Sequence, residues 1–90
     1  MEDRDWQRLD KWLWCARFMK ARSDCARLIA EGSTRINAQP TEKPHLRLRV
    51  GDVITLPLRG RVIVIEVLAL AARRGPAPEA RQLYRDLEPG

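Results

Sequence analysis

The first part of the chain carries apolar residues at helical spacing. Within residues 9–18, the apolar positions at i, i+3, i+4 and i+7 are Leu9, Trp12, Leu13 and Ala16. This spacing predicts a helix whose apolar stripe packs on the core. Asp10 falls in the first turn of this helix, where the helix dipole favours an anion.

A second helix is predicted over residues 24–31. Ser23 precedes it as a natural N-cap, and Gly32 follows it at the position where helices often end in a left-handed residue. Its apolar stripe consists of Cys25, Leu28 and Ile29. A short basic connection, residues 20–22, joins the two helices.

After Gly32 the pattern changes to short strands separated by turns. Residues 34–36 predict a strand, and residues 37–40 a turn-like stretch. A half-buried alternation follows, in which Arg47 and Arg49 separate three apolar residues, Leu46, Leu48 and Val50. Residues 53–56 predict another strand, residues 59–60 a tight turn, and residues 62–70 the longest strand.

A Gly-Pro-Ala-Pro stretch at residues 75–78 separates these strands from a last amphipathic segment. Residues 79–87 predict a helix with one stripe formed by Ala80, Leu83, Tyr84 and Leu87. We expect this helix to cover Trp14 and Phe18, which lie off the apolar stripe of the first helix, because large aromatic side chains are usually buried. The alternative is that both aromatics stay exposed beside Lys11 and stack on unpaired bases.

Length and composition indicate a single small α+β protein. The chain has 90 residues, of which 44% are apolar, enough for a small core with little room for a substrate pocket. We expect two helices on a small, mostly antiparallel sheet, with a short C-terminal helix. The predicted division is a domain over residues 8–70 and a C-terminal extension over residues 71–90.

The charge balance favours a nucleic-acid partner. The net charge is +5, the isoelectric point is near 10.0, and all but three of the 17 Lys and Arg residues are Arg. Arginine matches phosphate groups bidentately and stacks on bases. A GC-rich genome with a preference for arginine codons would give the same excess.

Other classes of protein find little support in the sequence. Cys15 and Cys25 do not make a disulfide framework, and with His45 as the single histidine they cannot complete a zinc site of Cys and His ligands. We therefore expect no cofactor and no metal. The start of the chain does not resemble a signal peptide, and no apolar run is long enough to span a bilayer, so we expect a cytoplasmic protein without a membrane partner.

The order of motifs resembles the S4-type RNA-binding domain over residues 8–56. The matching positions are Arg8-Leu9-Asp10-Lys11, Leu13, Arg22-Ser23, Ala26, Leu28-Ile29, Gly32, Asn37, Lys43-Pro44, Gly51-Asp52 and Val53-Ile54. The resemblance implies an S4-like (alpha-L motif) fold and RNA binding. One departure is Asn37-Ala38, where the family commonly has Asn-Gly; alanine would be strained in a left-handed conformation, so the turn is expected to differ.

The whole chain is similar to a narrower group, the bacterial ribosome-associated heat-shock proteins of fifteen kilodaltons. This similarity rests on residues 11–14, 16–18, 20–22, 73–80 and 83–84. It implies a heat-shock, stress-response role and binding to ribosomal RNA of the large subunit. In that group the target is a free large subunit that still carries a nascent chain on transfer RNA, and the outcome is its recycling.

Eight cations are the predicted RNA-binding residues: Arg8, Lys11, Arg17, Lys20, Arg22, Arg27, Arg35 and Lys43. They would contact phosphates and recognise the shape of folded RNA more than its bases. Arg47 and Arg49 are expected to be ordinary outward-facing strand residues. A second, weaker basic patch is expected from Arg73, Arg74, Arg81 and Arg85.

Three competing functions remain open at this point. Two helices with a tight turn also fit a helix-turn-helix DNA-binding regulator, although the short second helix exposes few side chains that read bases. A ribosomal-protein interaction module using Trp14 and Phe18 is the second. An enzyme is the third, and we expect none, because no nucleophile–base pair or phosphate-binding glycine loop is seen. Nothing in the sequence suggests an obligate dimer, so we expect a monomer.

Overall fold

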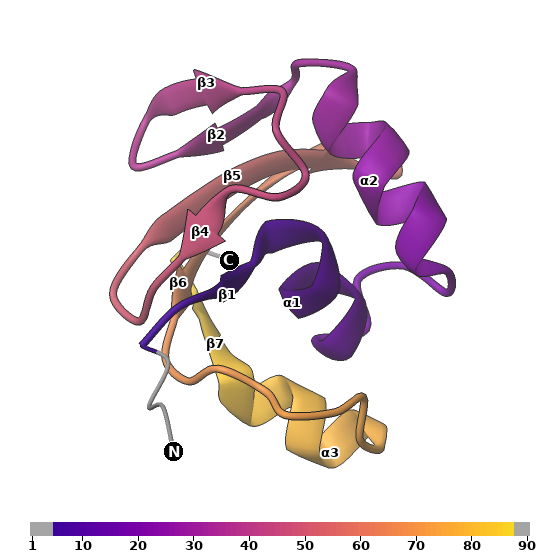
Figure 1. The fold of residues 1–90 in the computed structure, drawn as a ribbon, viewed down its shortest axis with the longest axis vertical. Coiled ribbons are helices and arrows are strands. Elements are labelled where there is room, and N and C mark those ends of the chain that lie inside the picture. Colours follow the sequence, from indigo (N-terminus) through magenta and orange to yellow (C-terminus); the bar gives the residue numbers. More distant parts are fainter. Residues whose placement is uncertain (1–4, 88–90) are drawn as a thin grey trace.

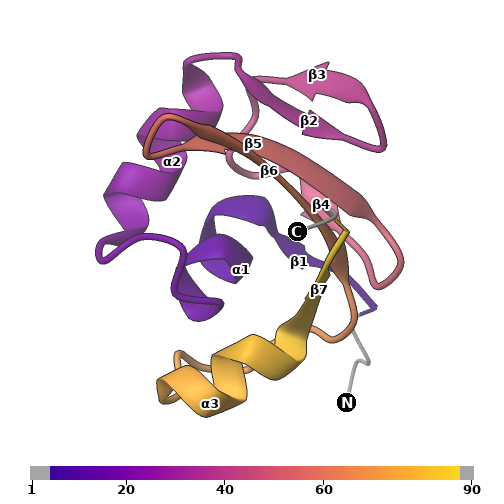
Figure 2. The ribbon, with the colours of Figure 1, turned by 180° about the vertical axis from the view of Figure 1, so that it is seen from behind.

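Two helices lie in the hollow of a curved antiparallel sheet. The computed structural model describes residues 5–87. The start of the chain, which did not resemble a signal peptide, lies outside these residues. The helices are α1 (Leu9–Cys15) and α2 (Arg22–Ala30). Figures 1 and 2 show the sheet curving around α1, with α2 beside it and α3 (Ala77–Ala80) on the far side of α1 from α2.

All strand pairs in the described residues are antiparallel. The main sheet has the order β3-β2-β5-β6-β7, and a separate two-stranded sheet pairs β1 with β4. The strands are β1 (Gln7–Arg8), β2 (Thr34–Ile36), β3 (Gln39–Thr41), β4 (Arg47–Leu48), β5 (Val53–Leu58), β6 (Arg61–Val67) and β7 (Tyr84–Asp86). The predicted α+β class with helices on a small antiparallel sheet is confirmed.

The core lies between the helices and the concave face of the main sheet. Register aligns Ile36 with Ile54 and Ile54 with Ile65, so alternate residues of three neighbouring strands point to the same side. All three isoleucines are buried. The predicted stripe of α1 meets them, since Leu9, Trp12, Leu13 and Ala16 are also buried.

The helix α1 is shorter than its apolar pattern predicted. It ends at Cys15 because Arg17 adopts a left-handed conformation with φ of 65°. The Arg17 N–H donates to the carbonyl of Trp14, and the Phe18 N–H donates to that of Leu13. These two bonds make a Schellman ending, with arginine at the position usually taken by glycine.

The helix α2 begins earlier than predicted, and Ser23 is not its N-cap. The capping residue is Ala21, which has an extended backbone and no side-chain capping bond. The carbonyl of Ala21 accepts the N–H groups of Asp24 and Cys25, so Ser23 is already helical. Gly32, with φ of 88°, ends the helix in the left-handed conformation that its position predicted.

The hairpin turns use left-handed residues. Arg59 and Gly60, the predicted tight turn, join β5 to β6 with positive φ at both positions. Asn37 and Ala38 do the same between β2 and β3, with φ of 52° and 71°. The expectation that alanine changes the turn is therefore wrong: the left-handed turn forms with alanine in it.

Two predicted strands are shorter than their patterns indicated. In the alternating stretch around Arg47, only the two residues of β4 form a strand. Leu48 in this strand is buried, whereas Val50 beyond it is 57% exposed. The longest strand, β6, stops at Val67 because the N–H groups of Leu68 and Ala69 both turn to the carbonyl of Leu83.

The predicted short C-terminal helix is present, but its predicted range, residues 79–87, is wrong. The chain forms the short helix α3, one 3₁₀ turn (Arg81–Leu83) and then β7, which pairs with β6. Sheet hydrogen bonds with Ile65–Val67 replace the helical ones that the apolar spacing suggested. The expected cover of the aromatics is present in another form: the Tyr84 ring lies 4.8 Å from that of Phe18, and the Arg74 guanidinium lies 5.4 Å from that of Trp14.

Candidate nucleic-acid interface

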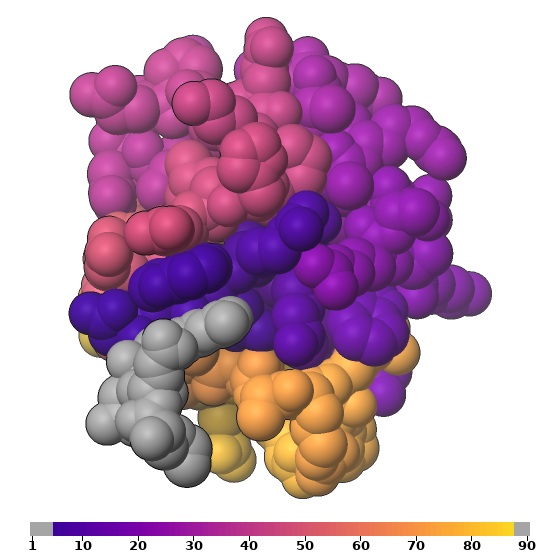
Figure 3. All heavy atoms as spheres, viewed as in Figure 1, coloured from indigo at the N-terminus to yellow at the C-terminus, as the bar shows by residue number. Residues whose placement is uncertain are grey.

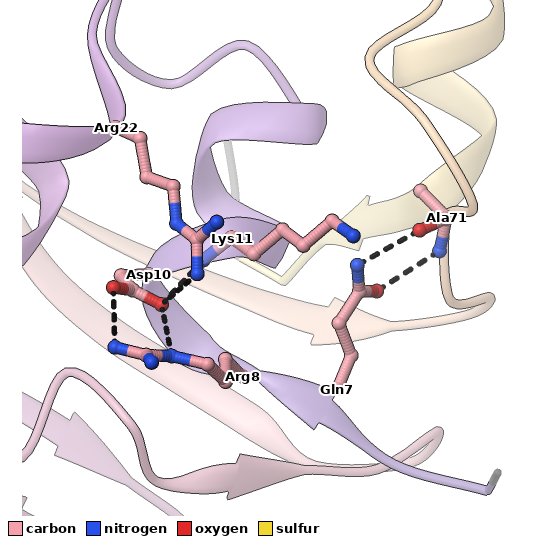
Figure 4. A network of polar contacts seen from close by, with 6 residues as sticks. All are labelled: Gln7, Arg8, Asp10, Lys11, Arg22 and Ala71. Carbon is pink, nitrogen blue, oxygen red and sulfur yellow. Dashed lines mark hydrogen bonds and ion pairs between the residues drawn. The ribbon is translucent and has the colours of Figure 1, made fainter.

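A buried carboxylate holds two arginines from different elements beside the start of α1. Asp10 is 4% exposed, and its carboxylate accepts bonds from Arg8 Nε at 3.1 Å and Arg8 Nη2 at 3.0 Å. Arg22 Nη2, from the first residue of α2, reaches the same carboxylate at 3.4 Å. Figure 4 shows the two guanidinium groups on either side of Asp10. We call Arg8, Asp10 and Arg22 the arginine clamp.

Lys11 extends from α1 beside this clamp. Its side chain points toward Gln7 and Ala71 (Figure 4), while its backbone N–H donates to Asp10 Oδ1 at 2.8 Å. A hollow of about 530 Å³ lies here, lined by Trp6, Gln7, Arg8, Lys11, Arg22 and residues 70–72. In Figure 3 the N-terminal segment crosses this face between the segment around β4 and the segment that follows β6. Three predicted RNA-binding residues, Arg8, Lys11 and Arg22, thus meet at one place.

Pairing between β1 and β4 adds Arg47 to this group of cations, although the sequence predicted only an ordinary outward-facing strand residue there. Arg47 of β4 pairs with Arg8 of β1, and its guanidinium lies 4.6 Å from the centre of the Trp6 ring. The alternating pattern alone gave no sign of this contact, because the partner strand β1 has only two residues. The cationic surface therefore consists of Arg8, Lys11, Arg22 and Arg47.

The first strand is fixed by a residue distant in sequence. The side-chain amide of Gln7 donates to the carbonyl of Ala71 at 2.8 Å and accepts the Ala71 N–H at 3.0 Å. The Leu9 N–H also donates to the carbonyl of Leu46. β1, and with it Arg8, is thereby anchored on two sides.

Arg17 does not join this surface through its Nε group. That N–H donates to the carbonyl of Gly75 at 2.7 Å. Arg74, in the same segment as Gly75, donates to the carbonyls of Trp14 at 3.0 Å and Met19 at 3.4 Å. Both arginines connect the end of α1 to the chain after β6. Their positive charges also interact favourably with the negative end of the helix dipole.

The other predicted residues lie on separate elements. Arg27 is exposed on α2 and pairs with Asp24 at 3.6 Å, and Lys20 is exposed in the turn before α2. Arg35 is exposed on β2. Lys43 lies in the loop after β3 and lines a second hollow of about 850 Å³ together with Arg47 and Arg49.

The second basic patch is largely neutralised by neighbouring carboxylates. Arg73 pairs with Glu79 at 3.5 Å, and Arg85 pairs with Glu66. Arg74 is bound to the end of α1, which leaves Arg81 as an exposed cation in the 3₁₀ turn. Exposed ion pairs of this kind contribute little stability, but they reduce the positive potential available to RNA.

The two cysteines belong to the core. Both are free and fully buried. Burial raises the pKa of the Cys25 thiol to about 11, and burial likewise raises the pKa of Cys15. Neither thiol is therefore activated as a nucleophile. Within residues 5–87 there is no cluster of potential metal ligands, and no helix there is long and apolar enough to cross a membrane.

The family of the chain follows from comparison with known proteins. The model of the S4 domain matches residues 7–54, a segment that runs from β1 into β5 and includes the arginine clamp. The chain belongs to the S4 domain family. S4 domains are RNA-binding modules, and residues 7–54 of this chain match one of them.

Relatives of this S4 domain protein include heat shock protein 15. The homologue from Haemophilus influenzae is 38% identical over 81 residues, covering 90% of this chain and 61% of the relative. Heat shock protein 15 of Escherichia coli is 37% identical, covering 88% of this chain and 59% of that protein. The chain thus spans about three fifths of the length of these relatives. The small ribosomal subunit protein uS4 of Pelobacter propionicus is 35% identical over 82 residues.

A solved structure has the same fold. It is described as a trimeric structure of heat shock protein 15 from Vibrio cholerae, with a TM-score of 0.85 and 40% sequence identity. The superposition covers 90% of this chain and 81% of that one. The resemblance to the heat-shock proteins of fifteen kilodaltons is therefore confirmed in sequence and in structure.

Proposed function

We propose that this S4 domain protein binds ribosomal RNA of the large subunit without catalysing a reaction. The observation that carries the proposal is the convergence of Arg8, Lys11, Arg22 and Arg47 on one face beside a hollow. Planar guanidinium groups match phosphate oxygens, and an ammonium group adds a compact charge. The similarity to heat shock protein 15 supports the choice of a ribosomal target.

The finer role follows that of the related group. We propose that the protein acts in the cytoplasm, as a monomer, on free large subunits that carry a nascent chain on transfer RNA, and that it promotes their recycling under heat stress. The cationic surface would contact the RNA backbone, and Lys20, Arg27, Arg35 and Lys43 would extend the contact onto neighbouring elements. Arg17 is the weakest member of this set, because its Nε is engaged by Gly75.

Binding to purified ribosomal subunits at increasing salt tests this proposal. If about five phosphates are neutralised, log K should fall against log salt with a slope of about −3 to −5. We expect large subunits to bind more tightly than small subunits at equal salt, and nuclease treatment to abolish binding. Equal binding to both subunits would contradict the choice of subunit. A flat salt response, or binding that survives nuclease, would contradict the RNA contact and favour a ribosomal-protein partner.

A further inference from the structure

The negative charge of Asp10 is unexpected on the cationic surface. Asp10 pairs with Arg8 and Arg22 on the face proposed to bind RNA, and a carboxylate there repels phosphate. Charge alone therefore predicts that removing this carboxylate would strengthen RNA binding. The geometry predicts the opposite.

The carboxylate of Asp10 orders two flexible side chains at once. It accepts hydrogen bonds from two N–H groups of Arg8 and one of Arg22, whereas each guanidinium group has five N–H groups. Both arginine side chains remain substantially exposed, at 48% and 41%, so their other donors face solvent. A free arginine loses side-chain entropy when it is immobilised, and much of that loss has already occurred in the clamp.

Asp10 is itself held rigidly. The Lys11 N–H donates to its Oδ1 at 2.8 Å, and its own N–H donates to the carbonyl of Pro44 at 3.0 Å. A carboxylate held by a backbone N–H, on a residue whose own backbone is hydrogen-bonded, orients the groups that bind it. The clamp thus links β1 to α2 through one acidic side chain.

We propose that Asp10 is a positioning residue that presets Arg8 and Arg22 as a fork for RNA phosphate. This inference rests on the proposed RNA binding and specifies how the site achieves it. Ordering the fork before RNA arrives lowers the entropy cost of forming charge-assisted bonds to phosphate.

The test compares Asp10→Asn with Asp24→Asn. Both changes remove one acidic charge that is paired with arginine, but Asp24 and Arg27 form an exposed pair within α2. Binding to large-subunit and to small-subunit ribosomal RNA is measured over a salt series. Asp24→Asn should bind either RNA as tightly as the wild type or more tightly. Asp10→Asn should bind about tenfold more weakly, with a salt slope smaller in magnitude by about 1.

A background without the fork separates positioning from general damage. In a chain carrying Arg8→Ala and Arg22→Ala, adding Asp10→Asn should no longer weaken binding, as measured at low salt. Thermal melts of each variant verify that the compared proteins are folded. If Asp10→Asn does not fold, Arg8→Lys serves instead: it keeps the charge but cannot form the bidentate pair, and it should bind about fivefold more weakly. The matched Arg81→Lys should bind normally.

The outcomes distinguish this inference from the function on which it rests. Asp10→Asn or Arg8→Lys binding as tightly as the wild type would overturn the positioning role while leaving RNA binding intact. A loss with Asp10→Asn, together with equal wild-type binding to both RNAs, would support the fork and contradict the preference for the large subunit. Wild-type protein that binds neither RNA would overturn both.

Discussion

Ala38 is held in a conformation that its side chain disfavours. Its φ of 71° lies in the left-handed region, where a Cβ costs about 1–2 kcal/mol. Part of the gain from glycine is lost to the greater freedom of the unfolded chain. We expect Ala38→Gly to raise the free energy of unfolding by about 1 kcal/mol and the melting temperature by about 4–8 °C. Calorimetry or urea unfolding measures this.

The neighbouring residue provides the control for that turn. Asn37 is also left-handed, but its side chain donates to Asp52 at 3.1 Å and accepts the Val53 N–H at 2.8 Å. Asn37→Gly removes both bonds and should destabilise the protein. A stabilising effect of Asn37→Gly, or a destabilising effect of Ala38→Gly, would contradict this account of the turn.

The candidate site was partly predictable at the level of residues. Arg8, Lys11 and Arg22 followed from the family motif, and the structure brings them together. Asp10 was explained only by the helix dipole, because sequence spacing does not reveal that it binds Arg22 twelve positions later. The bond of Arg17 to Gly75 was not predictable for a similar reason: it spans 58 positions, and a left-handed arginine leaves no mark on an apolar pattern.

At the level of elements, periodicity located the structure better than it determined its type. The helices α1 and α2 lie where apolar spacing placed them. The C-terminal segment had helical spacing too, yet Tyr84–Asp86 pairs with β6, because an open sheet edge satisfies the same backbone groups. Competition between a helix and a distant edge strand cannot be decided from local pattern.

The edge strand β7 and the residues before it should contribute substantially to stability. Deleting residues 76–90 removes α3, the pairing with β6 and the Tyr84 ring, which lies 4.8 Å from Phe18 and 6.5 Å from Trp12. We expect a loss of about 2–4 kcal/mol in the free energy of unfolding, seen as a lower melting temperature. Tyr84→Ala should reproduce part of the loss, whereas Arg81→Ala, in the exposed 3₁₀ turn, should have little effect. An unchanged melting curve after the deletion would show that Phe18 and Trp12 do not depend on this cover.

Across the whole molecule, the arginines of the two basic patches are neutralised by carboxylates to different extents. The cations near β1 and α2 share one carboxylate, whereas Arg73 and Arg85 of the second patch each have a carboxylate partner. Arg22→Glu should therefore weaken binding to large subunits at least tenfold, by removing a phosphate contact and adding repulsion. Arg81→Glu makes the same change in net charge and should weaken binding less than about threefold. Equal losses in a filter-binding or sedimentation assay would move the site to the C-terminal segment.

The bonds between Gln7 and Ala71 also determine when this surface can be completed. A ribosome releases residue 7 long before residue 71, so a partly synthesised chain has β1 without its second anchor. Arg8 then extends from a strand tied on one side alone. Translation must proceed past residue 71 before the amide of Gln7 finds its partner, and the edge proposed to face RNA becomes rigid only then.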